Sequence, residues 1–283
     1  MSLGLFEKLI PNMKDLGERR SAKQYHLMIE CLRSSFADAR KYITDPNVMN
    51  YSPAELLFNE NLLRNRLNRV NPKHVESYRD VSSLPFSSSN TVSFQVVDKF
   101  GNAVSMVNST YEGFGTGICP SGTGFSLQSR GSNFSLNESS LNRVEGNKRP
   151  YHTIIPGLSL YKKDQSLHSS FTVMGAFMQP QGHFQILSNL IDWNDSPQEA
   201  LDEPRFCLQA GLSDSDDDLK VFFEDGFDPK VLKELKTEFH HKIELKEGYD
   251  RALFGRGQII LRKDDVLYGG SDGRADGCAI PGF

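Results

Sequence analysis

The sequence predicts an α+β protein in which helices precede and follow a central group of strands. Residues 21–42 repeat apolar side chains at steps of three and four, which is typical of a helix with one buried face. Residues 92–110 instead alternate apolar and polar side chains on both sides of Gly101, which indicates a β-hairpin. A hydrophobic content of 38% and a charged content of 24% over 283 residues are ordinary for a globular protein with a substantial core.

The N-terminal quarter carries clear signals for helix starts. Ser21 and Gln24 have the spacing of a capping box, and Pro53 follows Ser52 at the first position of a second helix that is expected to run through Leu63. His26 lies in the first helix, where a structural histidine is the expected role rather than a catalytic one. From residue 70 to 90 prolines and serines replace the apolar repeat, which predicts a loop or linker.

The hairpin has a predictable register. Lys99-Phe100-Gly101 forms a three-residue loop, with glycine at the left-handed position, so residue i pairs with residue 200 − i. Thr91 then faces Ser109, two hydroxyls across a strand pair. If the loop differs by one residue, Thr110 takes the place of Ser109.

A threonine at the head of a strand, directly after a Ser-rich segment, has a specific chemical use. If the bond between Asn90 and Thr91 is cut, the freed α-amine of Thr91 can serve as general base for its own hydroxyl. The same hydroxyl could attack the preceding carbonyl and so cut the chain. From spacing alone, a β-forming threonine without chemistry is the alternative interpretation.

The remaining elements are expected in the following order. A glycine-rich solvent loop covers residues 113–124, a strand ends near Val173, and a helix runs from about Gln181. Capped helices start at Ser196 and Asp228, and two short strands cover residues 257–261 and 266–269. The acidic segment 213–218 lacks the pattern of a calcium loop and is expected to be a solvated surface.

Several kinds of partner are not supported by the sequence. A net charge of −4 gives no reason to expect nucleic acid, and no apolar run approaches the roughly 18 residues of a membrane helix. No secretory signal is visible, so a cytoplasmic location is expected if the chain is complete. No metal and no cofactor are expected, because the cysteines lack metal spacing and read as free, mostly buried thiols: Cys31, Cys119, Cys207 and Cys278.

Several long segments resemble one known family. They are TVSFQVVDKFGNAVSMVNSTYEGFGTG, GTGFSLQSRGSNFSL, NKRPYHTIIPGL, VMGAFMQPQGHFQILSNLID, PQEALDEPRF, FGRGQII and GGSDGRADG. In this order they resemble the small subunit of the gamma-glutamyltransferase (glutathione hydrolase) family, in its acylase-like branch. The resemblance implies the αββα sandwich of N-terminal-nucleophile hydrolases, self-cleaved before Thr91. Residues 1–90 would be the end of the large subunit with its processing linker, and residues 91–283 the small, catalytic subunit.

The resemblance also implies a set of site residues. The catalytic group would comprise Thr91 as nucleophile, Ser109 opposite it, and an oxyanion hole at Gly175 and Ala176, where the family has two glycines. The substrate-binding positions would be Tyr111, Arg130, Asn133, His152 and Thr153. At the first three, glutathione-cleaving members have an asparagine, an amide and an acid, so the changes remove negative charge that would pair with an α-ammonium group. Glutathione itself is therefore in doubt as the substrate.

Two hypotheses follow. The first is an enzyme that cleaves γ-glutamyl or related acyl amides through a threonyl ester, the two processed halves being each other's partner. The second is a truncated, non-catalytic fragment or pseudoenzyme that keeps the small-subunit fold. Family precursors carry a long N-terminal portion with no counterpart here, so the sandwich is expected to be incomplete and to leave an apolar sheet face uncovered.

Overall fold

A computed structural model describes residues 1–75, 89–208 and 220–282, and the chain divides into two compact units. The first unit comprises Met1–Phe86, Gly131–His152 and Leu208–Leu245, and the second comprises Ser87–Arg130, Thr153–Cys207 and Lys246–Phe283. The predicted division between residues 90 and 91 is a processing boundary. It is not tested by this spatial division and stays a prediction.

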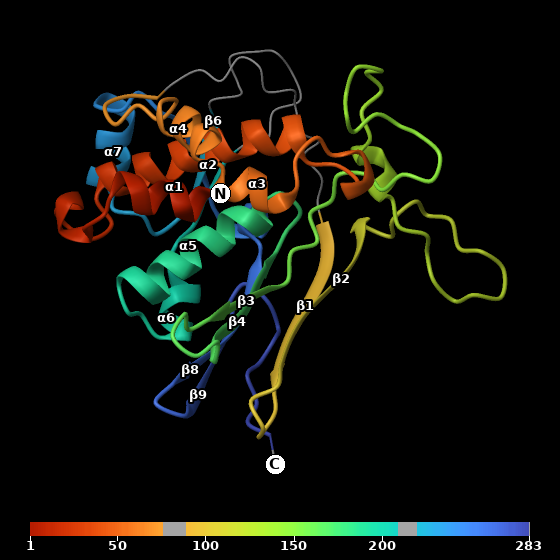
Figure 1. The fold of residues 1–283 in the computed structure, drawn as a ribbon. Helices are drawn as coiled ribbons and strands as arrows, with labels where there is room; N and C mark the ends of the chain where they lie inside the picture. Colours follow the sequence, from red (N-terminus) through yellow and green to blue (C-terminus); the bar gives the residue numbers. More distant parts are fainter. Residues whose placement is uncertain (76–88, 209–219, 283) are drawn as a thin grey trace. The chain divides into compact units, whose positions relative to one another are not determined.

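The first unit is mainly helical (Figure 1). Its helices are α1 (Ser2–Leu9), α2 (Ala22–Tyr42), α3 (Pro53–Phe58), α4 (Glu60–Leu67) and α7 (Pro229–Thr237), with short 3-10 turns at η1 (Met13–Leu16) and η2 (Pro46–Val48). The longest, α2, packs against α1 and α7 and is buried along most of its length. Ser21 caps it by accepting from the Gln24 backbone N–H, as predicted. The Gln24 side chain accepts from the Arg20 backbone N–H, so the reciprocal bond of the capping box goes to the neighbouring residue.

The second predicted helix is in fact two helices. Ser52 and Glu55 form a complete capping box at the start of α3, as expected. Asn59 then adopts an extended conformation, and its side chain accepts from the backbone N–H groups of Asn61 and Leu62. An asparagine side chain that satisfies these N–H groups starts a new helix, so α4 begins where the sequence predicted a continuation.

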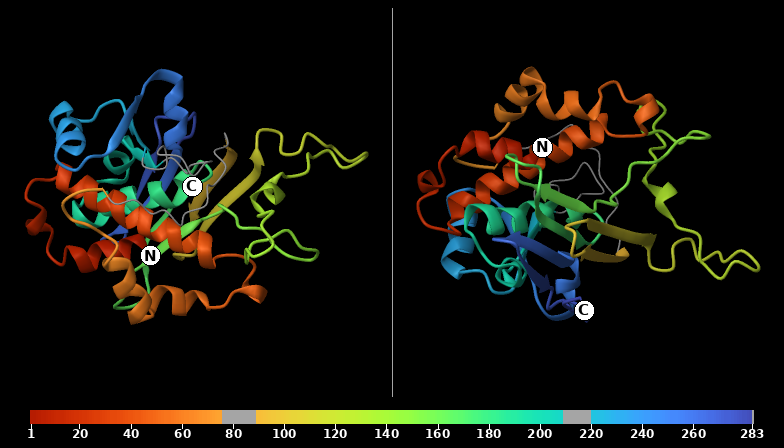
Figure 2. Two further views of the ribbon diagram at one scale, coloured as in Figure 1. Left: turned by 90° about the horizontal axis from the view of Figure 1, so that it is seen from above. Right: turned by 60° about the horizontal axis from the view of Figure 1, so that its bottom comes forward.

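The second unit contains a four-stranded antiparallel sheet in the order β3-β4-β8-β9. These strands are β3 (Gly157–Leu160), β4 (Leu167–Met174), β8 (Arg256–Lys263) and β9 (Val266–Ser271). The helices α5 (Met178–Asp192) and α6 (Pro197–Asp202) pack on this sheet (Figures 1 and 2). The shared apolar core consists of Phe171, Val173, Ile186, Leu187, Leu190, Ala200, Leu201 and Ile259. The predicted capping box of α6 and both C-terminal strands are confirmed, and α5 begins three residues before the predicted start.

The predicted hairpin lies on the other face of this sheet. It consists of β1 (Ser89–Val97) and β2 (Ala103–Glu112), paired so that Val97 faces Ala103 and Thr91 faces Ser109. Gly101 has φ +85°, as the three-residue loop requires. Gln95 donates to Thr172 at 2.7 Å, on the face of β4 opposite to Phe171 and Val173. The second unit therefore stacks helices, the four-stranded sheet and the hairpin in that order, which gives three successive layers of the predicted sandwich.

The hairpin turns its polar side inward. Ser170 donates to the Gln95 side chain, and Ser105 donates to the Phe171 carbonyl. The outward side carries apolar residues that are 46–66% exposed, namely Val92, Phe94, Val96, Val104 and Met106. The expectation of an uncovered apolar sheet face is confirmed for this hairpin.

The C-terminal motif holds a buried ion-pair group. The Asp272 carboxylate accepts from Arg205 at 2.7 Å, from Arg274 at 3.0 Å and from the Gly257 backbone N–H at 2.7 Å. Burial alone would raise the pKa of Asp272, but Arg205, Arg274 and the hydrogen bonds hold it below its ordinary value. This group fixes the end of the chain against β8 and explains why the segment GGSDGRADG is rich in charge although it is partly buried.

Other elements were not predicted or were predicted incorrectly. A sheet in the order β5-β6-β7 is formed by β5 (Phe206–Leu208), β6 (Lys220–Glu224) and β7 (Lys242–Lys246), and neither it, nor α1, nor β3 was expected. Cys119 and Cys278 are exposed, so the prediction of mostly buried thiols is wrong for two of the four free cysteines. The acidic segment 213–218 and most of the 70–90 linker lie outside the described residues. Within the described ranges, no helix combines the length and apolar character needed to cross a membrane.

Candidate active site

Thr91 is at the inner face of the hairpin, near the start of β1, and only 4% of its surface is exposed. Its hydroxyl donates to the Ser109 hydroxyl at 2.9 Å across the strand pair. The predicted pairing of two hydroxyls is therefore confirmed, and the Thr110 alternative is excluded.

The strand pairing is irregular at the bond that precedes Thr91. Ser89 pairs with Glu112 and Thr91 pairs with Ser109, so the single residue Asn90 faces two residues of β2. This β-bulge places Tyr111 at φ +77°, and the Tyr111 backbone N–H donates to the Ser109 hydroxyl at 2.9 Å. A left-handed backbone costs a non-glycine residue roughly 1–2 kcal/mol, and such strain is found preferentially at functional sites.

Arg130 connects the two hydroxyls to the rest of the site. Its guanidinium donates to Ser109 at 3.2 Å and to Thr153 at 3.0 Å, and it lies over the Tyr111 ring at 4.7 Å from the ring centroid. Burial lowers the pKa of Arg130, but an arginine stays cationic at any physiological pH. Five predicted site residues, Thr91, Ser109, Tyr111, Arg130 and Thr153, thus form one connected group.

This arrangement surrounds the Ser109 oxygen with donors. The Thr91 hydroxyl, the Tyr111 backbone N–H and the Arg130 guanidinium all lie within hydrogen-bond distance of it. Positive charge one hydrogen bond away from Thr91 favours a developing negative charge on the threonine oxygen. The group can therefore hold the Thr91 hydroxyl in place and support its ionisation.

Gly175 and Ala176 lie in the turn between β4 and α5. Gly175 has φ +134°, and a Cβ atom there would lie 3.1 Å from the Cα of Gly255, which accounts for glycine at this position. Ala176 has φ +50°, a left-handed conformation that disfavours alanine. Their carbonyls accept from Met178 and Gln179 at the start of α5. Their role as an oxyanion hole stays a prediction.

The branch residues Gln179 and His183 lie behind this turn. Gln179 is fully buried, and its side-chain oxygen accepts from the Ile155 backbone N–H at 2.9 Å, two residues after Thr153. Burial lowers the pKa of His183 to about 3, so its ring is neutral, and it meets Phe171 edge-on. Gln179 thus supports the segment that carries Thr153, and His183 packs against β4.

Two predicted substrate residues belong to the other compact unit. Asn133 is buried, and its carbonyl accepts from the Asn142 side chain at 2.7 Å. His152 is exposed. Because they belong to the first unit, their contact with a substrate bound at Thr91 stays a prediction.

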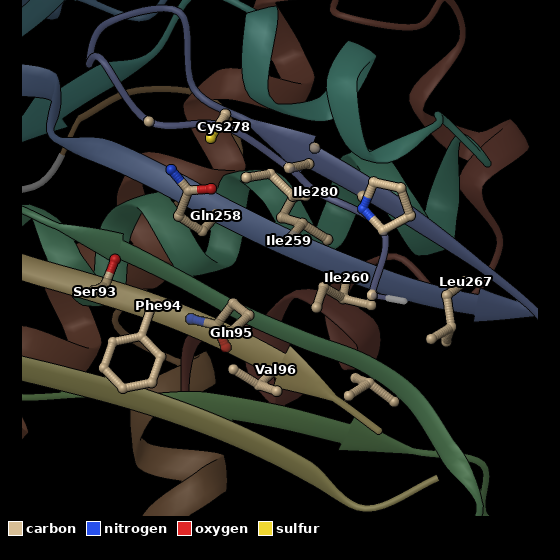
Figure 3. A pocket seen from close by; sticks show the side chains of 17 residues that line it. Ser93, Phe94, Gln95, Val96, Gln258, Ile259, Ile260, Leu267, Cys278 and Ile280 are labelled. Atoms are coloured by element: carbon tan, nitrogen blue, oxygen red, sulfur yellow. The ribbon is translucent and has the colours of Figure 1, made fainter. Parts of the chain in front are cut away.

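A groove of about 680 Å³ opens beside β1 in the second unit (Figure 3). Its walls come from β1, from β8 and β9, and from residues 277–282 of the C-terminal segment. Gln95 and Gln258 are its amide side chains, and most of the other labelled side chains are apolar. None of the five connected residues around Thr91 lines this groove, so we assign the groove no part in the threonine chemistry.

The second unit, with its helix layer, sheet and inward hydroxyls, has the α+β fold of N-terminal-nucleophile hydrolases. The family profile of Gamma-glutamyltranspeptidase matches residues 1–282, and the chain belongs to this family. The resemblance read from the sequence motifs is therefore confirmed.

Individual relatives include both hydrolases and an acylase. The chain is 31% identical over 263 residues to the glutathione hydrolase-like YwrD proenzyme of Bacillus subtilis, covering 93% of this chain and 48% of that protein. It is 28% identical to the oxamate amidohydrolase proenzyme of Klebsiella pneumoniae, covering 98% and 50%. The crystal structure of cephalosporin acylase from Bacillus halodurans is 36% identical with a TM-score of 0.77, covering 100% of this chain and 50% of that chain. The chain thus spans about half the length of these relatives.

Proposed function

We propose that this chain carries the catalytic centre of a self-processing amidohydrolase or acyltransferase whose nucleophile is Thr91. The observation that carries the proposal is the Thr91–Ser109–Arg130 hydrogen-bonded group, located beside a β-bulge that faces the Asn90–Thr91 bond. Membership in a family whose relatives are described as proenzymes supports a cleavage step.

The cleavage would proceed by an acyl shift. The Thr91 oxygen attacks the Asn90 carbonyl carbon, the C–N bond breaks, and the α-amine of Thr91 takes the proton. Water then hydrolyses the ester, which leaves a carboxylate on Asn90 and a free amine and hydroxyl on Thr91. The bulge on β2 opposite this bond interrupts the regular strand pairing, which supports an attack at this position.

The same hydroxyl would then act on an external amide. The free α-amine takes the hydroxyl proton, the oxygen attacks the acyl carbonyl, and the resulting oxyanion is held by the backbone N–H groups of Gly175 and Ala176. The ammonium returns the proton to the leaving amine. The threonyl ester is finally transferred to water or to an acceptor amine.

Arg130 suggests the class of acyl group. Within the described residues, two of its five side-chain N–H groups donate to hydroxyls, which leaves donors for a substrate carboxylate. A cation at this position attracts a carboxylate and repels an α-ammonium group, so a glutaryl amide should be preferred to a γ-glutamyl amide. The names of two relatives, an oxamate amidohydrolase and a cephalosporin acylase, point likewise to amides other than glutathione.

One observation favours the alternative of a non-catalytic family member. The outer face of the hairpin exposes five apolar side chains, as a sheet does when it is made to be covered by another layer. Such a chain could keep the fold and pair with a complete relative without turning over a substrate.

Substitution of the nucleophile distinguishes the two. In the protein produced from its own gene, Thr91→Ala should abolish both cleavage and hydrolysis of an acyl anilide, whereas Thr91→Ser should retain part of each. Ser93→Ala, two residues along the same strand face, is the matched control and should keep both. Full activity in Thr91→Ala would rule out the proposed nucleophile.

The acyl preference is tested separately with the processed protein. The ratio of kcat/KM for glutaryl and γ-glutamyl anilides should favour the glutaryl compound by on the order of ten- to a hundredfold, the value of one charge-assisted hydrogen bond. A clear preference for the γ-glutamyl compound would refute the role of Arg130 in acyl selection while leaving the nucleophile assignment intact.

A further inference from the structure

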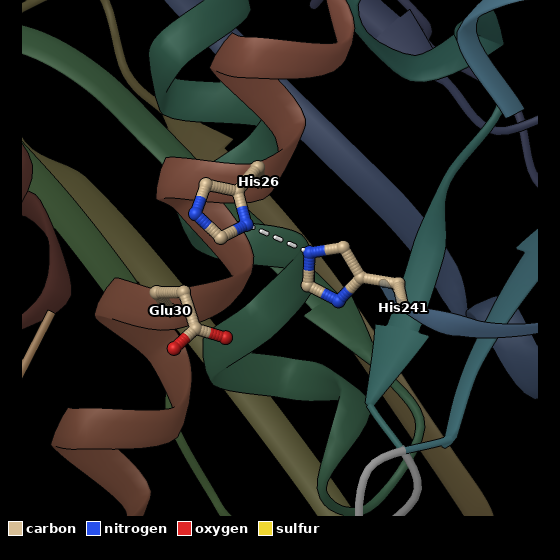
Figure 4. Close-up of side chains that lie close together, drawn as sticks. All are labelled: His26, Glu30 and His241. Atoms are coloured by element: carbon tan, nitrogen blue, oxygen red, sulfur yellow. Dashed lines mark hydrogen bonds between the residues drawn. The ribbon is translucent and has the colours of Figure 1, made fainter. Parts of the chain in front are cut away.

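A second group of reactive side chains lies in the first unit, away from any role in the proposed reaction. His26 and Glu30 are one turn apart on α2, and His241 directly precedes β7 (Figure 4). Their exposed fractions are 0%, 0% and 3%, and one potential ligand atom from each lies within 4.8 Å of the other two. Two imidazoles and a carboxylate that converge in this way form the donor set of a borderline metal ion.

The ring of His26 is oriented by its surroundings. Its Nε2 lies 2.7 Å from the Asn71 carbonyl oxygen, which can only accept, so Nε2 carries the proton and Nδ1 carries a lone pair. The ring also stacks on Phe239, with the centroids 4.4 Å apart. A histidine that donates one N–H to a backbone carbonyl while its other nitrogen faces a ligand cluster is the usual arrangement in metal sites.

His241 can supply the second nitrogen. Its Nε2 lies 2.8 Å from His26 Nδ1, and its buried Nδ1 has no hydrogen-bond partner among the described residues. When no metal is bound, His241 donates its Nε2–H to the lone pair on His26 Nδ1. Metal binding requires this proton to move to Nδ1 of His241, which leaves a lone pair on Nε2.

We propose that His26 Nδ1, His241 Nε2 and the Glu30 carboxylate bind Zn²⁺, with a water molecule as the fourth ligand. Two nitrogens at about 2.05 Å from a tetrahedral zinc ion would be about 3.3 Å apart, so the rings need to separate by only about 0.5 Å from their hydrogen-bonded distance. Binding exchanges the imidazole–imidazole hydrogen bond for two coordination bonds and releases no net proton from the histidines. The ion would join segments that are 215 residues apart in the sequence.

Arg33 sets the strength of this site. Its Nε lies 3.4 Å from the Glu30 carboxylate, and it is itself 7% exposed. Its positive charge neutralises Glu30 when no metal is bound and competes with the ion for that carboxylate. Removal of this charge should therefore tighten Zn²⁺ binding, an effect that a purely structural hydrogen-bond network would not show.

Zinc binding can be measured directly on the 283-residue chain. After treatment with a chelator and removal of the chelator, titration of the protein with Zn²⁺ against a chromophoric zinc indicator should give one site per chain, and saturation should raise Tm. Glu30→Gln and His241→Gln should each weaken binding by on the order of a hundredfold or more, since loss of even an outer-sphere partner costs about 10- to 100-fold. Arg33→Gln should strengthen binding.

His240→Asn is the matched control, because His240 is the exposed neighbour of His241 and has φ +61°, which asparagine tolerates. This variant should bind Zn²⁺ like the unaltered chain. Absence of stoichiometric binding in the unaltered chain, or binding that survives in Glu30→Gln and His241→Gln, would overturn the proposal. Circular dichroism of the variants shows whether each is folded. If a variant does not fold, the absorption spectrum of the unaltered chain with Co²⁺ in place of Zn²⁺ reports the ligand geometry.

Discussion

Replacement of Arg130 by methionine is expected to change which acyl group is cleaved more than how fast cleavage occurs. Methionine fills similar volume and keeps apolar contact with the Tyr111 ring, over which the guanidinium lies at 4.7 Å. It removes the donors to Ser109 and Thr153, and with them the positive charge that we propose for carboxylate recognition.

The magnitude follows from the contacts that are lost. A hydrogen bond to a charged group contributes about 1.5–3 kcal/mol, so loss of the contact with a substrate carboxylate should lower kcat/KM for a glutaryl anilide by roughly ten- to a hundredfold. An anilide of an uncharged acyl group of similar length makes no such contact. Its kcat/KM should fall only by the smaller amount that reflects weaker positioning and weaker support for ionisation of Thr91 through Ser109.

The assay is the ratio of kcat/KM for the charged and uncharged anilides, measured for the unaltered protein and for Arg130→Met. The control is Arg143→Met, because Arg143 is about half exposed and pairs with the exposed Glu145. The ratio should collapse in Arg130→Met and stay unchanged in Arg143→Met. If both anilides lose the same factor in Arg130→Met, Arg130 only positions the hydroxyls and does not select the acyl group.

Three further outcomes are expected. Ala176→Gly should stabilise the fold by about 0.5–1 kcal/mol in urea titrations, because φ +50° disfavours alanine, and a loss of stability would contradict that strain. Asp272→Asn should destabilise by about 3–5 kcal/mol because it removes a buried carboxylate that pairs with Arg205 at 2.7 Å. The pKa of Asp272 is lower in the folded than in the unfolded chain, so its ionised carboxylate stabilises the fold above the unfolded value of about 3.9. This stabilisation is lost as the pH falls through the folded pKa. The free energy of unfolding of Asp272→Asn should therefore vary less with pH in acid than that of the unaltered chain. The 283-residue chain expressed alone should stay uncut at the bond before Thr91, because cleavage needs the Asn90 carbonyl held against the Thr91 hydroxyl. A misplacement of these groups by about 1 Å can cost on the order of a hundredfold in rate. Intact mass after prolonged incubation tests this.

Much of the second unit could be predicted because its signals are local. The hairpin register follows from Gly101 and the loop length, and the capping box at Ser196 fixes the start of α6. Which face of the hairpin lies inward could not be read from alternation alone. The inner face is polar because Ser170 and Thr172, distant in sequence, supply partners for Gln95. Local pattern carries no information about such partners.

In the candidate site, too, contacts within the hairpin could be predicted, whereas contacts that depend on tertiary packing could not. The pairing of Thr91 with Ser109 follows from the hairpin alone, and the motif match supplies Arg130 and Thr153. The bulge at Tyr111 was not predicted, because an aromatic residue is a poor candidate for a left-handed backbone. The approach of His241 to His26 could not be foreseen either, because the two are joined only through tertiary packing and the expectation for His26 was a structural histidine.

The most direct test of a threonine nucleophile at position 91 is the chemical state of the bond that precedes it. Trypsin should release residues 80–99 as one peptide from uncut protein, because no lysine or arginine lies between Arg79 and Lys99. In active protein purified from its native source, mass spectrometry should instead find residues 80–90 and a peptide of residues 91–99 with a free α-amine on Thr91. An active preparation in which the 80–99 peptide is quantitatively intact would contradict the assignment.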